Sequence, residues 1–481
     1  MTKCFDFVVV GGGVAGSICA NTVCRLRPNA TVCLISPSEY LKSVKVVKQV
    51  SEHLEELTVI EEPFGKSKVP NLTFVQDFVA RLEPQEKKVV LNSGEVLSYG
   101  KLALCTGASP KVHDNSPFLL TVRDTDSAQT LNKALSKARK VIVAGNGAIA
   151  LELVTKIRNV DLTWIVKHEH VGDSLLDCDV AQFLLDSHQD KNKENISVEE
   201  RKRPSGLPEK EEVEIEEAQI RFPLSQPQFG HGLGPKWTIN LSQRENESGD
   251  STSLQVLYRS KLAKVIENPS GSGSEWPIHA VLSNGKEIGA DLIVSCIGVL
   301  PNTTWLPKDV FEMAEDGGLL VDERMQTSVP DVYAAGDVCT LRDLNYGPQF
   351  FQVRLWSQAR LMADFAAHCM AGTPEADLLD LGFELFTHIT HFFGKKVILL
   401  GCYDGQRLQN EPEEDVVMYT RSDDETFVRV LLLRGRLQGA VLVGETDLEE
   451  LFENLILSGI DLTQYGPELL DPEAELDHVF D

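Results

Sequence analysis

The chain has 481 residues, which suggests about three domains of ordinary size. Apolar residues make up 42% of the chain and charged residues 25%, the proportions of a globular protein rather than of a disordered or fibrous one. Asp and Glu (72) outnumber Lys and Arg (46), so the net charge is −26. This acidic balance disfavours direct binding to nucleic acid or to anionic membranes, and no apolar run approaches the ~18 residues needed to cross a bilayer.

The start of the chain and its cysteines indicate a reducing compartment. MTKCFDFVVVGGG enters a β-rich run without a signal-peptide apolar region or an Arg- and Ser-rich presequence, so we expect a cytoplasmic or nuclear location. Ten scattered cysteines are ordinary at this length. We expect most of them to be buried as small apolar residues rather than to form a disulfide framework.

Three apolar runs are each followed by glycines: FDFVVVGGG near the start, KVIVAGNG from Lys140 and DVYAAGD from Asp331. Recurring units of strand, glycine turn and helix predict an α/β fold with parallel sheets. From Gly382, a few strands followed by an amphipathic helix predict a small C-terminal α+β domain.

The stretch near 187–274 differs from the rest because it is rich in charge, Pro, Gly and Ser. We expect much of it to be mobile, although apolar patches at 231–237 and near Leu254 could dock or form strands. The basic tripeptide 201–203 could be a targeting patch, but the surrounding glutamates favour a solvated charge run.

The first glycine run has the spacing GxGxxG, formed by Gly11, Gly13 and Gly16, between an apolar strand and a segment suited to a helix that begins at Val14 and Ala15. The first glycine permits a tight turn, the second lets the backbone approach a pyrophosphate, and the third lets the helix pack on the strand. This context predicts a dinucleotide site.

The second strand of that unit ends in SPSEY, where an acidic residue usually holds the ribose hydroxyls. Ser36 stands at that position, and its hydroxyl would bind ribose without charge assistance. Either Glu39 replaces the missing carboxylate or adenosine binding is weaker, and the sequence leaves both alternatives open.

The second glycine run, KVIVAGNGAIALELV, repeats the pattern in the GxGxxA form with Gly145, Gly147 and Ala150, and its helix begins at Ala148. Two such units predict two dinucleotides. The next strand ends with Lys167 and His168, where an acidic residue would favour NADH. Lys167 could pair with a 2′-phosphate or simply face solvent, so the expected ligand is NAD(P)H with a slight preference for NADPH.

Three further motifs complete the pattern: LALCTGA at 102–108, SCIGVLPNT at 295–303 and TSVPDVYAAGDVC ending at Cys339. Together with the glycine runs, they resemble the two-dinucleotide flavoproteins of the pyridine nucleotide-disulfide oxidoreductase family. The resemblance implies FAD in the first unit and NAD(P)H in the second. It also implies cofactor contacts from the motif residues Thr106, Gly107, Gly298, Gly336 and Asp337, with the Asp337 carboxylate accepting a hydrogen bond from the flavin ribitol.

The resemblance also implies a domain layout of two Rossmann-like dinucleotide-binding domains and a small α+β C-terminal domain. The FAD-binding domain would comprise residues 1–122 and 301–380, the NAD(P)H-binding domain residues 123–300 with the inserted segment, and the C-terminal domain residues 381–481. The C-terminal domain is similar to that of nitrite-reductase-like and rubredoxin-reductase-like members of the family.

One member of the family resembles the chain from end to end. That resemblance implies a flavoprotein that is reduced by NAD(P)H. It also implies that the protein associates with the tRNA-splicing ligase and limits the oxidative inactivation of this partner.

Many members of the family carry a redox CxxxxC shortly after the first-unit acidic position, but SPSEYLKSVKVVKQVS has no cysteine there. This departure argues against dithiol chemistry. Cys19 and Cys24 do spell CxxxxC, yet five residues along a helix would place them about 140° apart around its axis, with Cα atoms ~8 Å apart. We therefore do not expect them to form a redox pair.

The resemblance suggests residues that serve hydride transfer from NAD(P)H to the flavin. Lys48, or with less support Lys42, falls where related flavoproteins place a lysine beside the flavin. Glu152 matches a family glutamate that either lies near the nicotinamide or pairs with the flavin-side lysine. A surface role is the alternative for each lysine. Arg354, Trp356 and Gln358 lie in RLWSQAR, which is either near the flavin or simply core packing.

His388 and His391 are three residues apart in an apolar run, and on a helix they would share one face. We expect a buried or structural pair, and no Cys or His cluster has convincing zinc spacing, so no metal site is predicted.

Two functions fit these motifs. The first is an FAD-dependent NAD(P)H oxidoreductase without a redox dithiol, which passes electrons to dioxygen, a quinone-like molecule, a small electron carrier or an oxidised protein. The alternative is a nucleotide-loaded binding or protective module with little turnover, in which the insert or the C-terminal domain holds a partner.

Overall fold

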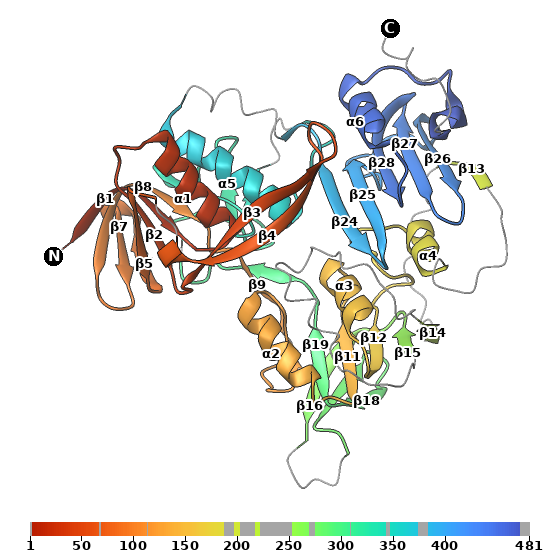
Figure 1. Ribbon diagram of the computed structural model, residues 1–481, viewed down its shortest axis with the longest axis horizontal. Helices are drawn as coiled ribbons and strands as arrows, with labels where there is room; N and C mark the ends of the chain where they lie inside the picture. The colour runs from red at the N-terminus through yellow and green to blue at the C-terminus, as the bar shows by residue number, and fades with distance from the viewer. Residues whose placement is uncertain are drawn as a thin grey trace. The chain divides into compact units, whose positions relative to one another are not determined.

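The computed structural model (Figure 1) describes most of the chain in two compact units. The first unit comprises residues 1–48, 57–109 and 299–386, and the second comprises residues 49–56, 110–298 and 387–481. The structure describes residues 2–66, 69–112, 114–186, 197–202, 217–221, 253–268, 275–307, 309–342, 347–373 and 383–471. Much of the segment that the sequence predicts to be mobile, including the patch at 231–237, lies outside these residues.

A seven-stranded sheet forms the core of the first unit, in the order β5-β2-β1-β8-β7-β6 with β22 paired to β8. The strands are β1 (Lys3–Val10), β2 (Val32–Ser36), β5 (Leu72–Gln76), β6 (Val79–Glu83), β7 (Lys88–Leu91), β8 (Val96–Leu104) and β22 (Val332–Ala334). Strands β5, β2, β1, β8 and β22 run parallel. The apolar runs of β1, β2, β8 and β22 are buried, as expected when helices cover a parallel sheet, whereas β5 at the edge is only partly buried.

Two helices from distant parts of the sequence pack together in this unit: α1 (Val14–Leu26) and α5 (Trp356–Ala371), seen side by side in Figure 1. Shorter elements complete the unit. They are the hairpin of β3 (Tyr40–Gln49) and β4 (Glu55–Pro63), the pair β9 (Ala108–Pro110) and β20 (Val299–Pro301), the pair β21 (Leu319–Val321) and β23 (Cys339–Leu341), and the turns η1 (Phe64–Lys66) and η2 (Pro84–Glu86). The tip of the hairpin, residues 49–56, belongs to the second unit.

The second unit contains a six-stranded sheet in the order β10-β19-β11-β12-β15-β14, with only β14 antiparallel to its neighbour. Its strands are β10 (Leu119–Leu120), β11 (Lys140–Ala144), β12 (Asp161–Ile165), β14 (Glu217–Arg221), β15 (Ser253–Leu257) and β19 (Leu292–Ser295). The helices are α2 (Thr125–Leu135), α3 (Ala148–Lys156) and α4 (Cys178–Asp186), and a smaller sheet holds β16 (Leu262–Glu267), β17 (Ile278–Leu282) and β18 (Glu287–Ala290). The patch near Leu254 therefore does form strands.

An antiparallel sheet in the order β13-β26-β27-β28-β25-β24 completes the second unit. It comprises β13 (Ser197–Lys202), β24 (Thr387–Phe392), β25 (Lys395–Gly401), β26 (Val416–Ser422), β27 (Phe427–Leu433) and β28 (Arg436–Val443), followed by α6 (Glu449–Ser458), with turns η6 (Glu413–Asp415) and η7 (Gly466–Leu470). Strand β13 comes from the inserted segment, so the first two residues of the basic tripeptide pair through their backbone with β26.

The predicted fold class is confirmed: two mixed sheets built mainly of parallel strands, each with a glycine turn between a strand and a helix, accompany a C-terminal α+β portion. Within the described part of the chain, no helix combines the length and apolar character that crossing a membrane requires.

Candidate functional site

The first glycine turn joins β1 to α1 and leaves no room for side chains at two of its glycines. Gly11 has φ +118°, and a Cβ there would lie 2.1 Å from the carbonyl oxygen of Cys105. A Cβ at Gly16 would lie 1.7 Å from the carbonyl oxygen of Gly11. The first glycine therefore makes the turn and the third lets α1 pack on the strand, as the sequence predicts.

Gly13 differs because a Cβ there would meet nothing within 4 Å. It is the N-cap of α1, which has no side-chain cap and no acidic residue in its first turn, where Val14 and Ala15 lie. By contrast, α2 is closed by its own capping box, in which the Asp124 carboxylate accepts from the backbone N–H of Ser127 at 2.9 Å. The free N–H groups of α1 and the open space above Gly13 fit a dinucleotide pyrophosphate.

Gly336 and Asp337 lie where α1 meets α5. Gly336 has φ +78°, and a Cβ there would come within 2.9 Å of the Ala15 Cβ. The half-buried Asp337 follows directly, and its backbone carbonyl accepts from Arg354 Nε at 3.0 Å. Arg354 also pairs with Asp316 at 2.6 Å. This placement beside the first turn of α1 is compatible with the predicted ribitol contact of the Asp337 carboxylate, which stays a prediction.

The start of α5 contains one polar group that needs a partner. The Ser357 hydroxyl is buried and has no hydrogen-bond partner among the described residues. Gln358 has a structural role, because its side chain accepts from the Val353 N–H at 2.7 Å and donates to the Phe351 carbonyl at 2.9 Å. Trp356 is half-buried in the same turn. An unpartnered hydroxyl close to the Gly336 turn fits the presence of a polar ligand.

The end of β2 places the two candidate ribose residues differently. Ser36 is buried, its hydroxyl accepts from the Ser38 N–H at 3.3 Å, and a Cβ at Gly12 would lie 2.5 Å from that hydroxyl. Glu39 is exposed three residues later. The Ser36 hydroxyl therefore leaves no room for a side chain at position 12, which explains the glycine there. Whether Ser36 or Glu39 binds the ribose stays open.

Asn302 ties down the segment that carries Thr106 and Gly107. Its amide donates to the Thr106 carbonyl at 2.8 Å, its backbone carbonyl accepts from the Thr106 hydroxyl at 3.1 Å, and its N–H donates to the Gly107 carbonyl at 2.9 Å. Gly107 has φ +64°. The sequence analysis missed Asn302, although its place in the SCIGVLPNT motif was a usable signal.

The two candidate lysines lie far apart on β3. The Lys42 N–H donates to the Gly12 carbonyl at 3.2 Å, and its ammonium pairs with Glu61 at 3.2 Å, with side chains only 24% and 11% exposed. Lys48 is exposed and lies six residues further along an extended strand, about 20 Å away. The structure therefore brings Lys42, rather than Lys48, next to the first glycine turn.

The second glycine turn repeats the first. Gly145 has φ +134°, and a Cβ there would lie 2.1 Å from the carbonyl oxygen of Cys296. Gly147 is the N-cap of α3, which has no side-chain cap and no acidic residue in its first turn, where Ala148 lies. Ala150 is fully buried. The open helix start fits a second pyrophosphate.

The strand ends around this second turn carry the remaining candidates. Lys167, just beyond β12, is exposed and has no ion pair with any described residue, whereas His168 pairs with Asp173. Gly298 is exposed with φ +102° and accepts from the Lys111 N–H at 2.8 Å. Their roles at NAD(P)H stay predictions.

Glu152 is 1% exposed in the middle of α3, one helical turn before Lys156. Burial lowers the pKa of Lys156, and the Glu152 carboxylate opposes this shift. The predicted role of Glu152 near the nicotinamide stays a prediction.

Cys19 and Cys24 both lie in α1, as predicted, and both are free. A hydrogen bond with the Cys105 thiol and burial raise the pKa of Cys19 well above its ordinary value, and burial raises the pKa of Cys24 to about 11. These thiols are protonated at neutral pH and are poor nucleophiles.

His388 and His391 lie on strand β24 rather than on a helix. Positions three apart on a strand point to opposite faces, so the two rings do not form a pair on one face. Burial lowers the pKa of His388 to about 4, which keeps this ring neutral at pH 7.

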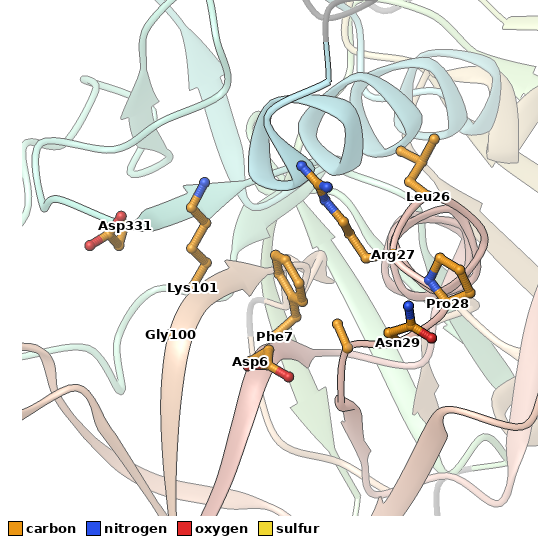
Figure 2. A pocket seen from close by; sticks show the side chains of 10 residues that line it. Asp6, Phe7, Leu26, Arg27, Pro28, Asn29, Gly100, Lys101 and Asp331 are labelled. Atoms are coloured by element: carbon orange, nitrogen blue, oxygen red, sulfur yellow. The ribbon is translucent and has the colours of Figure 1, made fainter.

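A pocket of about 650 Å³ opens at the opposite end of α1 from the glycine turn (Figure 2). Its two cations already have partners, because Arg27 donates to the Ala371 carbonyl and Lys101 donates to the Met370 carbonyl at 2.7 Å. They satisfy the C-terminal carbonyls of α5. The pocket therefore reflects helix capping and lies away from the candidate cofactor site.

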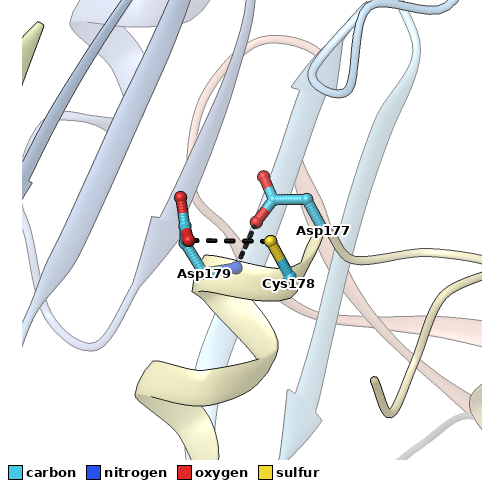
Figure 3. Close-up of side chains that lie close together, drawn as sticks. All are labelled: Asp177, Cys178 and Asp179. Carbon is cyan, nitrogen blue, oxygen red and sulfur yellow. Dashed lines mark hydrogen bonds between the residues drawn. The ribbon is translucent and has the colours of Figure 1, made fainter. Parts of the chain in front are cut away.

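Asp177, Cys178 and Asp179 gather their ligand atoms at the start of α4 (Figure 3). Both carboxylates are already neutralised, since Arg429 forms ion pairs with Asp177 and with Asp179, the latter at 2.6 Å. A guanidinium in that position opposes the binding of a cation, so the cluster acts as an ion-pair site.

The chain matches the family described as pyridine nucleotide-disulphide oxidoreductase over residues 5–221 and 239–363. It is 40% identical to a Danio rerio protein and 38% identical to a Pongo abelii protein, both named pyridine nucleotide-disulfide oxidoreductase domain-containing protein 1. These matches cover 100% of this chain and 98% and 99% of the relatives, respectively.

Solved structures share the fold at low sequence identity. The covalent putidaredoxin reductase–putidaredoxin complex is similar with a TM-score of 0.66, 15% identity and coverage of 99% of this chain and 98% of that chain. An NAD-dependent persulfide reductase from A. fulgidus is similar with a TM-score of 0.62, 18% identity and coverage of 95% and 77%.

Proposed function

The chain belongs to the pyridine nucleotide-disulphide oxidoreductase family and is an NAD(P)H-dependent flavoprotein oxidoreductase, and from this premise we propose that it works without a redox dithiol of its own. When bound, FAD accepts hydride from NAD(P)H and passes the electrons to an external acceptor. The observation that carries electron transfer between two bound dinucleotides is the repeated glycine turn: Gly11 against Cys105 and Gly145 against Cys296, each before an uncapped helix.

The residues of the chain bind and orient the two dinucleotides. The open space above Gly13 and the uncapped start of α3 take the pyrophosphates, held by backbone N–H groups. Asp337 accepts from the ribitol, and Lys167 faces the adenosine end of NAD(P)H. The protein contributes alignment rather than a nucleophile.

The positions and protonation of the cysteines support transfer of electrons from the flavin to an external acceptor without a thiol intermediate. No cysteine occurs between Ser36 and Ser51, and the buried thiols of α1 are held protonated. This arrangement suits several acceptors: a quinone-like molecule, a small electron carrier, dioxygen or an oxidised protein.

The proposal includes a protein partner. The end-to-end resemblance of the chain to a flavoprotein that associates with the tRNA-splicing ligase supports the same partner here, protected from oxidation in the cytoplasm or nucleus. Capture of the ligase by the NADH-loaded protein, with retention of ligase activity under oxidising conditions, would support this part. Equal loss of ligase activity with and without the flavoprotein would contradict it.

The electron-transfer proposal is tested by purifying the protein, recording its visible spectrum, and adding NADH and NADPH separately without oxygen. Rapid bleaching of the flavin band is expected, followed by recovery of the band when a quinone or dioxygen is added. Asp337→Ala should release FAD, and full occupancy in that variant would refute the ribitol contact. A bound flavin that stays oxidised with both nucleotides would instead favour a binding module.

A further inference from the structure

Residues 167–177, here called the nucleotide-side loop, connect the end of β12 to α4. The loop begins with Lys167 and runs beside the second glycine turn. Because residues that follow this strand contact the adenosine end of a dinucleotide in a Rossmann-like domain, the position of the loop affects nucleotide affinity.

Asn146, between Gly145 and Gly147, fastens the loop to the glycine turn. Its amide group donates to the His170 carbonyl at 2.9 Å and accepts from the Gly172 N–H at 2.7 Å. Its backbone carbonyl accepts from the Ser174 hydroxyl at 3.3 Å. The Asn146 side chain thus fixes two parts of the loop, and its backbone carbonyl fixes a third.

The loop is also cross-linked internally. His168 pairs with Asp173, and His170 Nε2 lies 3.1 Å from the Leu176 carbonyl oxygen. The Leu176 N–H donates to the Gly172 carbonyl at 2.8 Å. Such a loop shifts as a body when one of its ends is released.

The other end of the loop is held by the C-terminal sheet. One oxygen of Asp177 caps α4 by accepting from the N–H groups of Asp179 and Val180 at 2.9 and 3.0 Å. The other oxygen pairs with Arg429 of β27, which also pairs with Asp179 at 2.6 Å. The Arg429 side chain is only 3% exposed, so solvent screens these ion pairs little.

We propose that Asn146 and Arg429 are positioning residues for NAD(P)H: Asn146 fastens the nucleotide-side loop to the glycine turn, and Arg429 fastens it to the C-terminal sheet. The C-terminal sheet thereby contributes to nucleotide affinity although Arg429 lies on β27, outside the dinucleotide fold. This inference rests on the proposed function, because it assigns support residues to its nucleotide site.

The test compares Asn146→Ala, Asp177→Asn, Asp179→Asn, Arg429→Lys and Arg429→Met with the parent protein. Asn keeps the cap of α4 at position 177 but loses the charge that attracts Arg429. Arg434→Met is the matched control, because Arg434, in the turn after β27, also pairs with two carboxylates, Glu411 and Asp415, but is 56% exposed. FAD content, unfolding temperature, the limiting rate of flavin bleaching and the half-saturating NAD(P)H concentration are measured for each.

Asn146→Ala and Arg429→Met are expected to raise the half-saturating NAD(P)H concentration about tenfold while the limiting rate and FAD content stay within twofold. Arg429→Lys, Asp177→Asn and Asp179→Asn should give smaller increases, and Arg434→Met none. A merely structural role would lower the unfolding temperature and leave half-saturation unchanged, and that result would overturn the inference. If Arg429→Met does not fold, the two Asp→Asn variants decide. Failure of the parent protein to bleach with either nucleotide would refute the proposed function itself.

Discussion

The carbonyl oxygen of Cys105 occupies the place of a side chain at Gly11, at 2.1 Å from where a Cβ would lie. The same distance separates a Cβ at Gly145 from the carbonyl oxygen of Cys296. In each unit the chain following a parallel neighbour of the first strand, β8 or β19, closes over the first glycine of the turn. In both glycine turns a backbone carbonyl therefore packs against the first glycine. A side chain at that glycine would displace the backbone.

This relationship predicts that the two turns can be disabled separately. Gly11→Ala should abolish FAD retention, because the new Cβ collides with a backbone carbonyl and φ +118° is strained for alanine. Gly145→Ala should retain FAD and its visible spectrum. The rate at which NAD(P)H bleaches the flavin should fall at least about tenfold. Absorbance at purification and anaerobic bleaching measure the two effects.

Gly65→Ala is the control for both variants, since a Cβ at Gly65 would meet nothing within 4 Å. It should behave like the parent protein. Full FAD occupancy in a folded Gly11→Ala variant would mean that the first turn does not hold the flavin dinucleotide.

The two candidate lysines of β3 give a second prediction. Lys42→Met keeps the backbone N–H that donates to the Gly12 carbonyl but removes the ammonium that pairs with the 11%-exposed Glu61, so flavin bleaching should slow about tenfold. Lys48→Met changes an exposed side chain about 20 Å along the strand and should stay within twofold of the parent rate. A slow Lys48→Met variant beside a normal Lys42→Met variant would restore the preference drawn from the sequence.

The glycine turns were readable from the sequence because backbone sterics require glycine at Gly11 and Gly16 whatever surrounds them. The strands and helices beside the turns followed from apolar runs. Asn302 stands in a recognisable motif, although its bonds to Thr106 and Gly107 are seen only in the folded chain. The role of Asn146 could not be predicted, because its partners lie in a loop that only the folded chain brings close. The same applies to Arg429, whose carboxylate partners are about 250 residues away in sequence.

The histidines of β24 show a different limit. The FTHITHFF run fits a helix or a strand equally well over this short length, and only the pairing with β25 decides between them. The sequence also could not decide which lysine lies beside the flavin. Lys42 and Lys48 both fall in the expected region, and they are separated only because this segment forms the extended strand β3.

Lys167 gives a third prediction, on nucleotide preference. The exposed ammonium just beyond β12 is free of ion pairs with described residues and available to a 2′-phosphate. Lys167→Glu should lower the ratio of NADPH to NADH efficiency about tenfold or more, because a carboxylate repels the phosphate. Lys264→Glu, at an exposed position of β16 in the same unit, controls for the change in net charge. An unchanged ratio in Lys167→Glu would remove Lys167 from the nucleotide site.

His388 gives a prediction on pH and stability. Its pKa is lowered by burial from an ordinary 6.5 to about 4 in the folded protein. Between about pH 6.5 and pH 4 the His388 ring binds a proton in the unfolded chain but not in the folded protein. The free energy of unfolding therefore falls as the pH falls from about 6.5 towards 4. The loss amounts to at most about 3 kcal/mol.

His388→Leu cannot take up that proton and should escape this part of the acid destabilisation. The free energy of unfolding of the variant, minus that of the parent, should therefore rise between pH 7 and pH 4, measured by denaturant unfolding at each pH. His279→Gln, a substitution on β17, accounts for general effects of removing a histidine. A difference that stays constant with pH would show that the His388 ring takes up its proton as readily in the folded protein as in the unfolded chain, which would contradict the lowered pKa of His388.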